Sequence, residues 1–108
     1  MNINEYQKEA VKTAMYGSGL KIVYPTLGLA GEAGEVADKV KKVIRDHNGE
    51  FSEELKLEIA KELGDVLWYC ANISHDMGFT LDTIAKLNIE KIQSRRERNQ
   101  ISGSGDNR

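Results

Sequence analysis

The sequence predicts an all-α fold, a helical bundle of about four helices whose core is completed by dimerisation. The chain of 108 residues has one proline and few alternating β-branched stretches, which argues against a sheet. Its apolar residues instead recur every three to four positions, the period of a helix packed on one face. Two predicted helices of about 22 to 25 residues carry more apolar surface than so short a chain covers. We therefore expect a homodimer or a homotetramer.

The first two helices are predicted at residues 3–16 and 26–47. Gly17 begins a Gly-Ser-Gly sequence that ends the first helix, and Pro25 closes the short connector before the second. Asn48-Gly49 is a typical stop at the end of the second helix. The second helix carries an apolar stripe at helical spacing, made of Ala33, Val36, Ala37, Val40, Val43 and Ile44.

The third helix is predicted at residues 53–77 and the fourth at residues 81–93. Ser52 and Thr80 precede them and are suitable N-caps, because a side-chain oxygen there accepts from a free amide of the first turn. Gly78 ends the third helix. The core stripe of the third helix comprises Leu55, Ile59, Leu63, Val66, Leu67, Cys70, Ile73 and Met77.

Composition indicates one domain, residues 1–100, followed by a flexible C-terminal tail at residues 101–108 that contains Ser-Gly-Ser-Gly. The formal net charge of −2 argues against a surface for a nucleic-acid polymer or an anionic membrane. No apolar run approaches the roughly 20 residues of a membrane span. Cys70 is the single cysteine, which excludes an internal disulfide, so we expect a cytoplasmic protein.

Two acidic pairs with the same spacing are the main clue to function. Glu32 and Glu35 lie in the second predicted helix, and Glu62 and Asp65 lie in the third. Residues three apart share a helix face, so each pair directs two carboxylates the same way. Two such helices facing each other would form an all-oxygen cage. Such a cage suits Mg²⁺, with Mn²⁺ as a substitute, better than zinc or redox iron, which favour His or Cys ligands.

Acidic pairs also arise by chance, since the chain has 17 acidic residues, and Glu35 with Asp38 is a further example. Asp65, however, stands in an apolar stretch, where an unpaired charge is costly to bury. Lys39 and Lys91 would suit a polyphosphate bound with the metal. Glu–Lys pairs are also common on exposed helices. From the residues alone, a metal site and a solvated helix face both stay open.

The aromatic residues after the second acidic pair have different predicted roles. Tyr69 follows Asp65 by four residues and falls on the acidic face, where it could stack on a base or bond a phosphate or sugar. Trp68 points about 100° away along the helix and is interpreted as a core or interface residue. The two histidines and the cysteine lack the spacing of a nucleophile and its base.

Three segments resemble the MazG-like nucleoside triphosphate pyrophosphohydrolases of the all-α NTP pyrophosphatase superfamily. They are residues 28–36 (GLAGEAGEV), residues 61–69 (KELGDVLWY) and the Asn-Ile-Glu-Lys sequence at 88–91. The resemblance implies an all-α fold and Mg²⁺-dependent hydrolysis of a (deoxy)nucleoside triphosphate at the α–β bond. The products would be the monophosphate and pyrophosphate, and the expected role is nucleotide-pool sanitation.

The resemblance also implies residue roles, which we transfer position by position. The metal ligands would be Glu32, Glu35, Glu62 and Asp65, of which Glu35 and Asp65 are also the candidate catalytic residues, with Glu35 as general base. The substrate contacts would be Lys39, Tyr69, Asn88 and Lys91. Three alternatives stay open: a related enzyme acting on dUTP or phosphoribosyl-ATP, a non-catalytic module that binds metal and nucleotide, and a plain structural bundle.

Overall fold

The computed structural model describes residues 1–108 and is all-helical, which confirms the predicted fold class. None of its helices is long and apolar enough to cross a lipid bilayer. The elements are α1 (Ile3–Lys12), a short 3₁₀ helix η1 (Ser18–Leu20), α2 (Val23–Asp46), α3 (Glu53–Asp76) and α4 (Leu81–Glu97).

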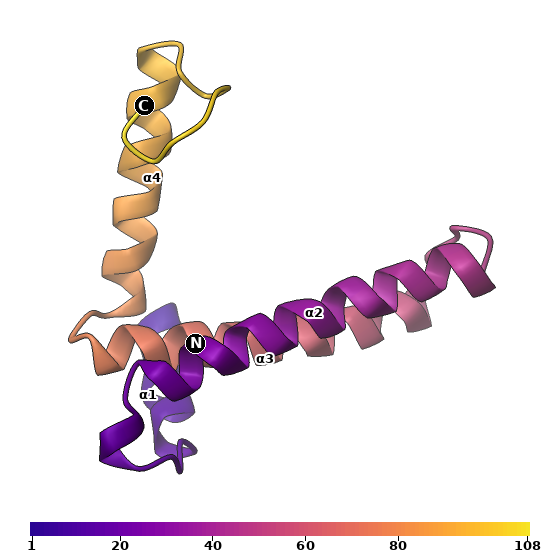
Figure 1. Ribbon diagram of the computed structural model, residues 1–108, viewed down its shortest axis with the longest axis horizontal. Coiled ribbons are helices and arrows are strands. Elements are labelled where there is room, and N and C mark those ends of the chain that lie inside the picture. The colour runs from indigo at the N-terminus through magenta and orange to yellow at the C-terminus, as the bar shows by residue number, and fades with distance from the viewer.

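The two longest helices, α2 and α3, lie side by side as an antiparallel hairpin, the long arm in Figure 1. The chain reverses at Asn48 and Gly49, whose φ angles of 56° and 75° are the left-handed values that Asn and Gly tolerate best. Ser52 then caps α3, because its hydroxyl accepts a hydrogen bond of 3.2 Å from the Leu55 amide. The predicted helix stop and cap are both confirmed.

A small core joins α1 to the C-terminal end of α3 and the start of α4. Ala10, Ala71 and Leu81 form its buried apolar cluster. Gln7 is buried beside them, and its Nε2 donates to the carbonyls of Ala71 and Phe79, each at 3.1 Å. The Gln7 Oε1 accepts from the Leu81 amide at 3.0 Å. One side chain thus ties three helices together, and its amide avoids the cost of a buried unpaired polar group.

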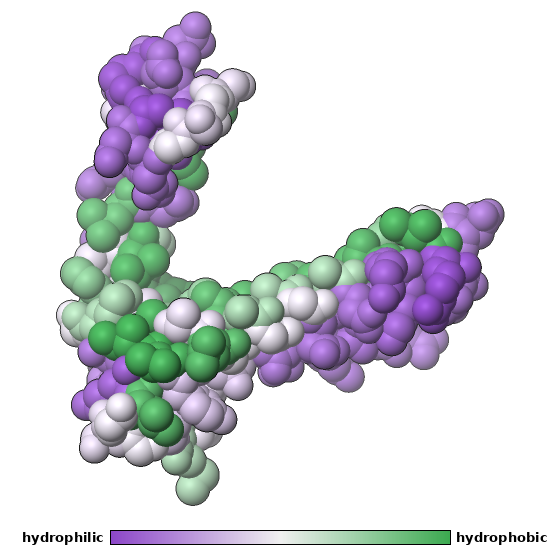
Figure 2. Space-filling model, viewed as in Figure 1, coloured by the Kyte–Doolittle hydropathy of each residue, from purple (hydrophilic) through white to green (hydrophobic).

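Beyond this core, α4 projects away from the α2–α3 hairpin (Figure 1). Thr80 caps its first turn, as predicted, by accepting from the Thr83 amide. Farther along, Leu87, Ile89 and Ile92 are 53%, 51% and 42% exposed. Figure 2 shows apolar surface on both α4 and the hairpin arm.

The predicted core stripes are only partly covered within one chain. Buried residues number 9 of 108, fewer than a folded domain of this length would bury by itself. Ile44 of the α2 stripe is 67% exposed, and Leu63 of the α3 stripe is 52% exposed. One chain by itself therefore leaves these two side chains of the predicted stripes uncovered. A second subunit that covers them stays a prediction.

Two predicted helix ends differ from the structure for identifiable reasons. α1 ends at Lys12 rather than Tyr16, because the Thr13 hydroxyl donates to the Ala10 carbonyl at 2.8 Å and accepts from Trp68 at 2.7 Å. α4 runs to Glu97 rather than residue 93. Its last turn is basic, which the negative end of the helix dipole favours.

The start of α2 also differs, since the helix begins at Val23 and includes Pro25 in its first turn. The first amides of a helix have no partner inside it, so the missing N–H of proline costs nothing there. Proline is therefore part of the helix start rather than the close of a connector.

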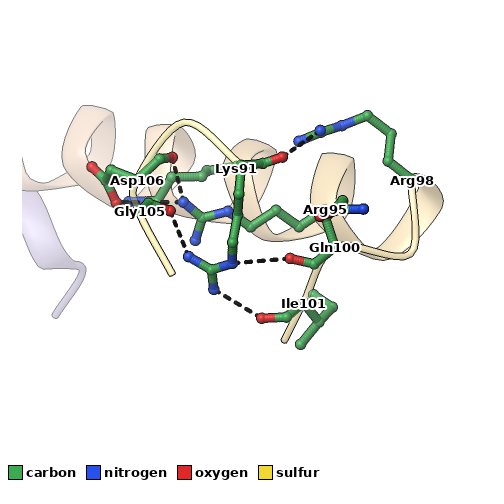
Figure 3. Close-up of polar contacts among 8 residues, drawn as sticks. Lys91, Arg95, Arg98, Gln100, Ile101, Gly105 and Asp106 are labelled. Carbon is green, nitrogen blue, oxygen red and sulfur yellow. Dashed lines mark hydrogen bonds and ion pairs between the residues drawn. The ribbon is translucent and has the colours of Figure 1, made fainter. Parts of the chain in front are cut away.

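Residues 101–108 form no helix and fold back along the end of α4 (Figure 3). The Arg108 guanidinium donates to three backbone carbonyls, those of Gln100 and Ile101 at the start of this segment and that of the nearby Gly105. Flexibility of the tail stays a prediction.

Candidate active site

Three carboxylates converge near the midpoints of the two hairpin helices. Glu32 of α2 and Glu62 and Asp65 of α3 each offer an oxygen, and these oxygens lie within 4.8 Å of one another. We call these residues the acidic triad. Glu62 and Asp65 share a face because they are three residues apart, and the pairing of the hairpin places Glu32 opposite them. Glu32 and Glu62 are half-buried, while Asp65 is exposed.

The acidic triad concentrates negative charge that nearby groups only partly offset. The pKa of Glu32 is raised above its usual value, first by burial and then by the negative charge of Asp65 and the neighbouring Glu62. The single cation in reach is Lys39 of α2, whose Nζ lies 3.8 Å from a Glu62 oxygen. Three carboxylates and one lysine leave a net negative, all-oxygen donor set, which fits a hard divalent cation.

Glu35 lies outside the acidic triad. It is exposed, one turn beyond Glu32 in α2, and it makes no hydrogen bond or ion pair. Its charge still contributes to the raised pKa of Glu32. One turn farther, Asp38 is committed to Lys41 and Lys42, each at 2.8 Å. Unlike Asp38, Glu35 is therefore both close to the acidic triad and free of an ion-pair partner.

An aromatic wall borders the acidic triad on the side away from the hairpin turn. Glu32, Asp65, Trp68 and Tyr69 line a cavity of about 290 Å³. Tyr69 lies over the backbone of Gly28, where an added Cβ would come within 2.1 Å of the Tyr69 Cε1. The glycine thus makes room for the ring. Sequence reasoning gave Gly28 no role of its own, although its position four residues before Glu32 puts it on the same face.

Trp68 belongs to both the core and this cavity. It packs on the cluster around Ala71, and its Nε1 donates to the Thr13 hydroxyl at 2.7 Å. Its ring also meets Tyr69 edge-on, with centroids 4.9 Å apart and planes at 85°. The predicted core contact is confirmed, and the contact with the cavity was missed because neighbouring helix residues diverge by 100°.

Two predicted substrate residues are not brought to the acidic triad. Asn88 and Lys91 lie on α4, which contacts α1 and α3 only from its N-terminal end (Figure 1). Asn88 is exposed. Lys91 pairs instead with Asp106 of the folded-back tail at 3.0 Å, and the same carboxylate lies 3.4 Å from Arg95 (Figure 3).

Comparison with known proteins gives the same family as the sequence motifs. A family model described as the MazG nucleotide pyrophosphohydrolase domain matches residues 25–99, which include the acidic triad and all of α3 and α4. The chain is also 44% identical over 114 aligned residues to the Gene 37 protein of Mycobacterium phage L5, with both chains covered completely. No solved structure was found to match the chain.

Proposed function

Because the chain belongs to the MazG nucleotide pyrophosphohydrolase family, we propose that it hydrolyses (deoxy)nucleoside triphosphates at the α–β bond. The products are a nucleoside monophosphate and pyrophosphate, and the role is sanitation of the cytoplasmic nucleotide pool. The observation that carries the proposal is the acidic triad, whose oxygens lie within 4.8 Å of one another beside a lysine and an aromatic wall. Carboxylate oxygens bind a divalent metal ion, a lysine binds a polyphosphate, and aromatic rings contact a nucleoside.

The acidic triad is proposed to hold Mg²⁺, with Mn²⁺ as a substitute, and coordination by Glu35, the fourth predicted ligand, stays a prediction. A cation held there would neutralise phosphate oxygens and lower the pKa of a water. Lys39, at 3.8 Å from Glu62, is within reach of the same space and would donate to the leaving pyrophosphate. Tyr69 would contact the nucleoside from the cavity wall.

Glu35 is proposed as the general base. A base must be near the reacting water and must not be fully engaged elsewhere. Two observations support this role: Glu35 lies one turn from Glu32, and it has no ion-pair partner. Asp65, the other predicted catalytic residue, would act through the metal as a member of the acidic triad.

The proposal includes a homodimer or homotetramer in which α4 of one subunit reaches the acidic triad of another. Within one chain, α4 carries Asn88 and Lys91 away from the acidic triad (Figure 1). It also leaves Ile89 and Ile92 half-exposed, and Leu63 beside the acidic triad is 52% exposed. Packing of α4 on a neighbouring hairpin would cover these residues and supply the missing substrate contacts.

The test of the reaction is pyrophosphate release from a panel of ribo- and deoxynucleoside triphosphates, with Mg²⁺, with Mn²⁺ and with chelator. We expect metal-dependent release with monophosphate as co-product, and loss of release in Glu62→Gln. The panel includes dUTP and phosphoribosyl-ATP, so it also tests the two related activities that the sequence left open. No release from any nucleotide, by folded protein that binds the metal, would refute hydrolysis and favour the binding module.

The shared site has a separate test in mixed subunits. Glu62→Gln and Lys91→Ala are each expected to be inactive alone. If α4 acts on the partner's acidic triad, a mixed dimer has one intact site, so an equal mixture of dimers recovers about a quarter of wild-type activity. If both residues act within one chain, the mixture recovers none. Light scattering before the assay gives the mass of the assembly.

A further inference from the structure

The connection between α1 and α2 contains a strained turn held in place by α3. Ile22 has φ 68° and ψ −52°, a conformation that β-branched residues rarely adopt. The Val23 amide donates across it to the Lys21 carbonyl at 2.7 Å, which defines a γ-turn of the positive-φ kind. One oxygen of Asp76, the last residue of α3, accepts from the Ile22 amide at 2.9 Å. The carboxylate of α3 therefore fixes this turn.

The same Asp76 oxygen also fixes an aromatic side chain. It accepts from the Tyr16 hydroxyl at 2.8 Å. The Tyr16 ring stacks on Tyr24, with centroids 5.0 Å apart and planes at 25°. Tyr24 is the second residue of α2, so its position depends on the turn at Ile22. Asp76 thus holds both neighbours of the Tyr24 ring, the turn that precedes it and the ring on which it stacks.

The stacked pair continues toward the acidic triad. Tyr24 lies one turn before Gly28, on the same face of α2, and Gly28 carries the Tyr69 ring on its backbone. Burial raises the pKa of Tyr69 first, and the nearby Tyr24 raises it further, which agrees with two neighbouring phenols. We call Tyr16, Tyr24, Tyr69 and Trp68 the aromatic row.

Core packing alone does not account for the aromatic row. Tyr24 is 47% exposed, and Tyr69 borders the cavity with Glu32 and Asp65. A side chain that served only the core would be covered, as Ala71 and Leu81 are. Strained backbone also persists only where surrounding contacts enforce it, and such places are often functional.

Resting on the proposed function, we propose that Tyr24 and Tyr69 form the nucleobase subsite and that Asp76 is its positioning residue. Aromatic side chains stack on any base, and their hydroxyls add polar contacts at the base edge or the sugar. The subsite lies on one side of the acidic triad, because Tyr24 precedes Glu32 in α2 and Tyr69 follows Asp65 in α3.

This placement gives the substrate a direction along the hairpin. Lys39 follows Glu32 in α2 and so lies toward the hairpin turn, on the opposite side of the acidic triad from Tyr24. The terminal phosphates therefore point toward the hairpin turn, and the base points toward α1. The α–β bond is left over the acidic triad, between the two ends.

The test compares ligands that differ only in the base. The single tryptophan of the chain, Trp68, contacts Tyr69 edge-on, so its fluorescence should report a ligand stacked on that ring. The full-length protein is titrated in Mg²⁺ with four nucleoside monophosphates and with ribose 5-phosphate, which has the sugar and phosphate but no base. We expect at least one monophosphate to bind about five- to 150-fold more tightly than ribose 5-phosphate, the range for stacking one base.

Variants assign that preference to the aromatic row. Tyr24→Ala should bring the monophosphate close to ribose 5-phosphate in affinity, while Tyr24→Phe should keep most of the preference because the ring is retained. Asp76→Ala should also reduce the preference and leave ribose 5-phosphate binding unchanged. Asp76→Asn should restore it, since an amide oxygen still accepts two hydrogen bonds. Phe51→Ala, at the hairpin turn, is the matched control and should change neither affinity.

The outcomes separate this proposal from the hydrolysis proposal, because the titration requires no turnover. Equal binding of ribose 5-phosphate and every monophosphate would overturn the base subsite, even in a protein that hydrolyses triphosphates. An equal loss of both affinities in Tyr24→Ala, or failure of Asp76→Asn to rescue Asp76→Ala, would overturn the assigned residues. A preference lost in Tyr24→Ala supports the subsite, even if no triphosphate is hydrolysed.

Discussion

Gly28→Ala tests the contact that places Tyr69 beside the acidic triad. The added methyl would lie 2.1 Å from Cε1, 2.4 Å from Cζ and 2.8 Å from Cδ1 of Tyr69. Ordinary contacts begin near 3.4 Å, so the ring has to move by more than 1 Å. Such overpacking costs about 1 to 3 kcal/mol. Alanine in place of glycine inside a helix gains about 1 kcal/mol. We therefore expect a net loss of about 0 to 2 kcal/mol.

Thermal unfolding of a double-mutant cycle isolates the contact. Gly34→Ala, in the same helix, meets nothing within 4 Å and should show only the helix gain. In a Tyr69→Ala background the obstructing ring is gone, so Gly28→Ala should become stabilising by about 1 kcal/mol. A Tm that rises equally for Gly28→Ala in both backgrounds would refute the reasoning. Gly28→Ala should also raise the KM for nucleotide, because it displaces the ring from the cavity.

Three further predictions concern the turn, the tyrosine and the acidic triad. Ile22→Gly should raise the Tm by several degrees, because glycine adopts φ 68° without strain; an unchanged or lower Tm would contradict the strain. Burial, followed by the hydrogen bond to Asp76, raises the pKa of Tyr16. Its contribution to stability is therefore complete below pH 10 and is lost as the pH rises above the unfolded value. Tm measured from pH 8 to 11 should fall less in Tyr16→Phe than in the wild type, and equal slopes would argue against the bond. Mg²⁺ at about 100 times its Kd should stabilise the protein by about 2.7 kcal/mol. That shift should vanish in Glu62→Gln and on addition of chelator, and a shift that survives the substitution would place the ion elsewhere.

Helix positions could be predicted from sequence where local chemistry decides them. Ser52 and Thr80 cap the predicted helices because the N-cap bond spans only three residues. The end of α1 could not be predicted, since the Thr13 hydroxyl is engaged by Trp68, 55 residues away. The turn at Ile22 was missed for the same reason, because it depends on Asp76 of another helix. Long-range partners leave no periodic signal in the chain.

The candidate site could likewise be predicted from sequence only where spacing within one helix decides it. Spacing within a helix predicted that Glu62 and Asp65 face one way, and pairing of the hairpin added Glu32. Spacing did not distinguish Glu35 from these three, because the packing of α2 on α3 decides how each helix is rotated about its own axis. Residue spacing also did not predict the direction of α4. The apolar face of this helix predicts a packing partner but does not identify the chain that supplies it. Lys91 could therefore be named but not placed.

The three hydrogen bonds of Gln7 fix the start of α4, while the rest of that helix extends away from the core. α4 has 17 residues, and a helix rises about 1.5 Å per residue, so Lys91 lies roughly 15 Å from the buried Leu81. A tilt of about 10° at the start of α4 would displace Lys91 by roughly 2.6 Å, close to the length of a hydrogen bond. Such a tilt would displace the far end of α4 more than its buried start. Substitution of Gln7, which is remote from the acidic triad, should therefore change the direction of α4 and the position of Lys91.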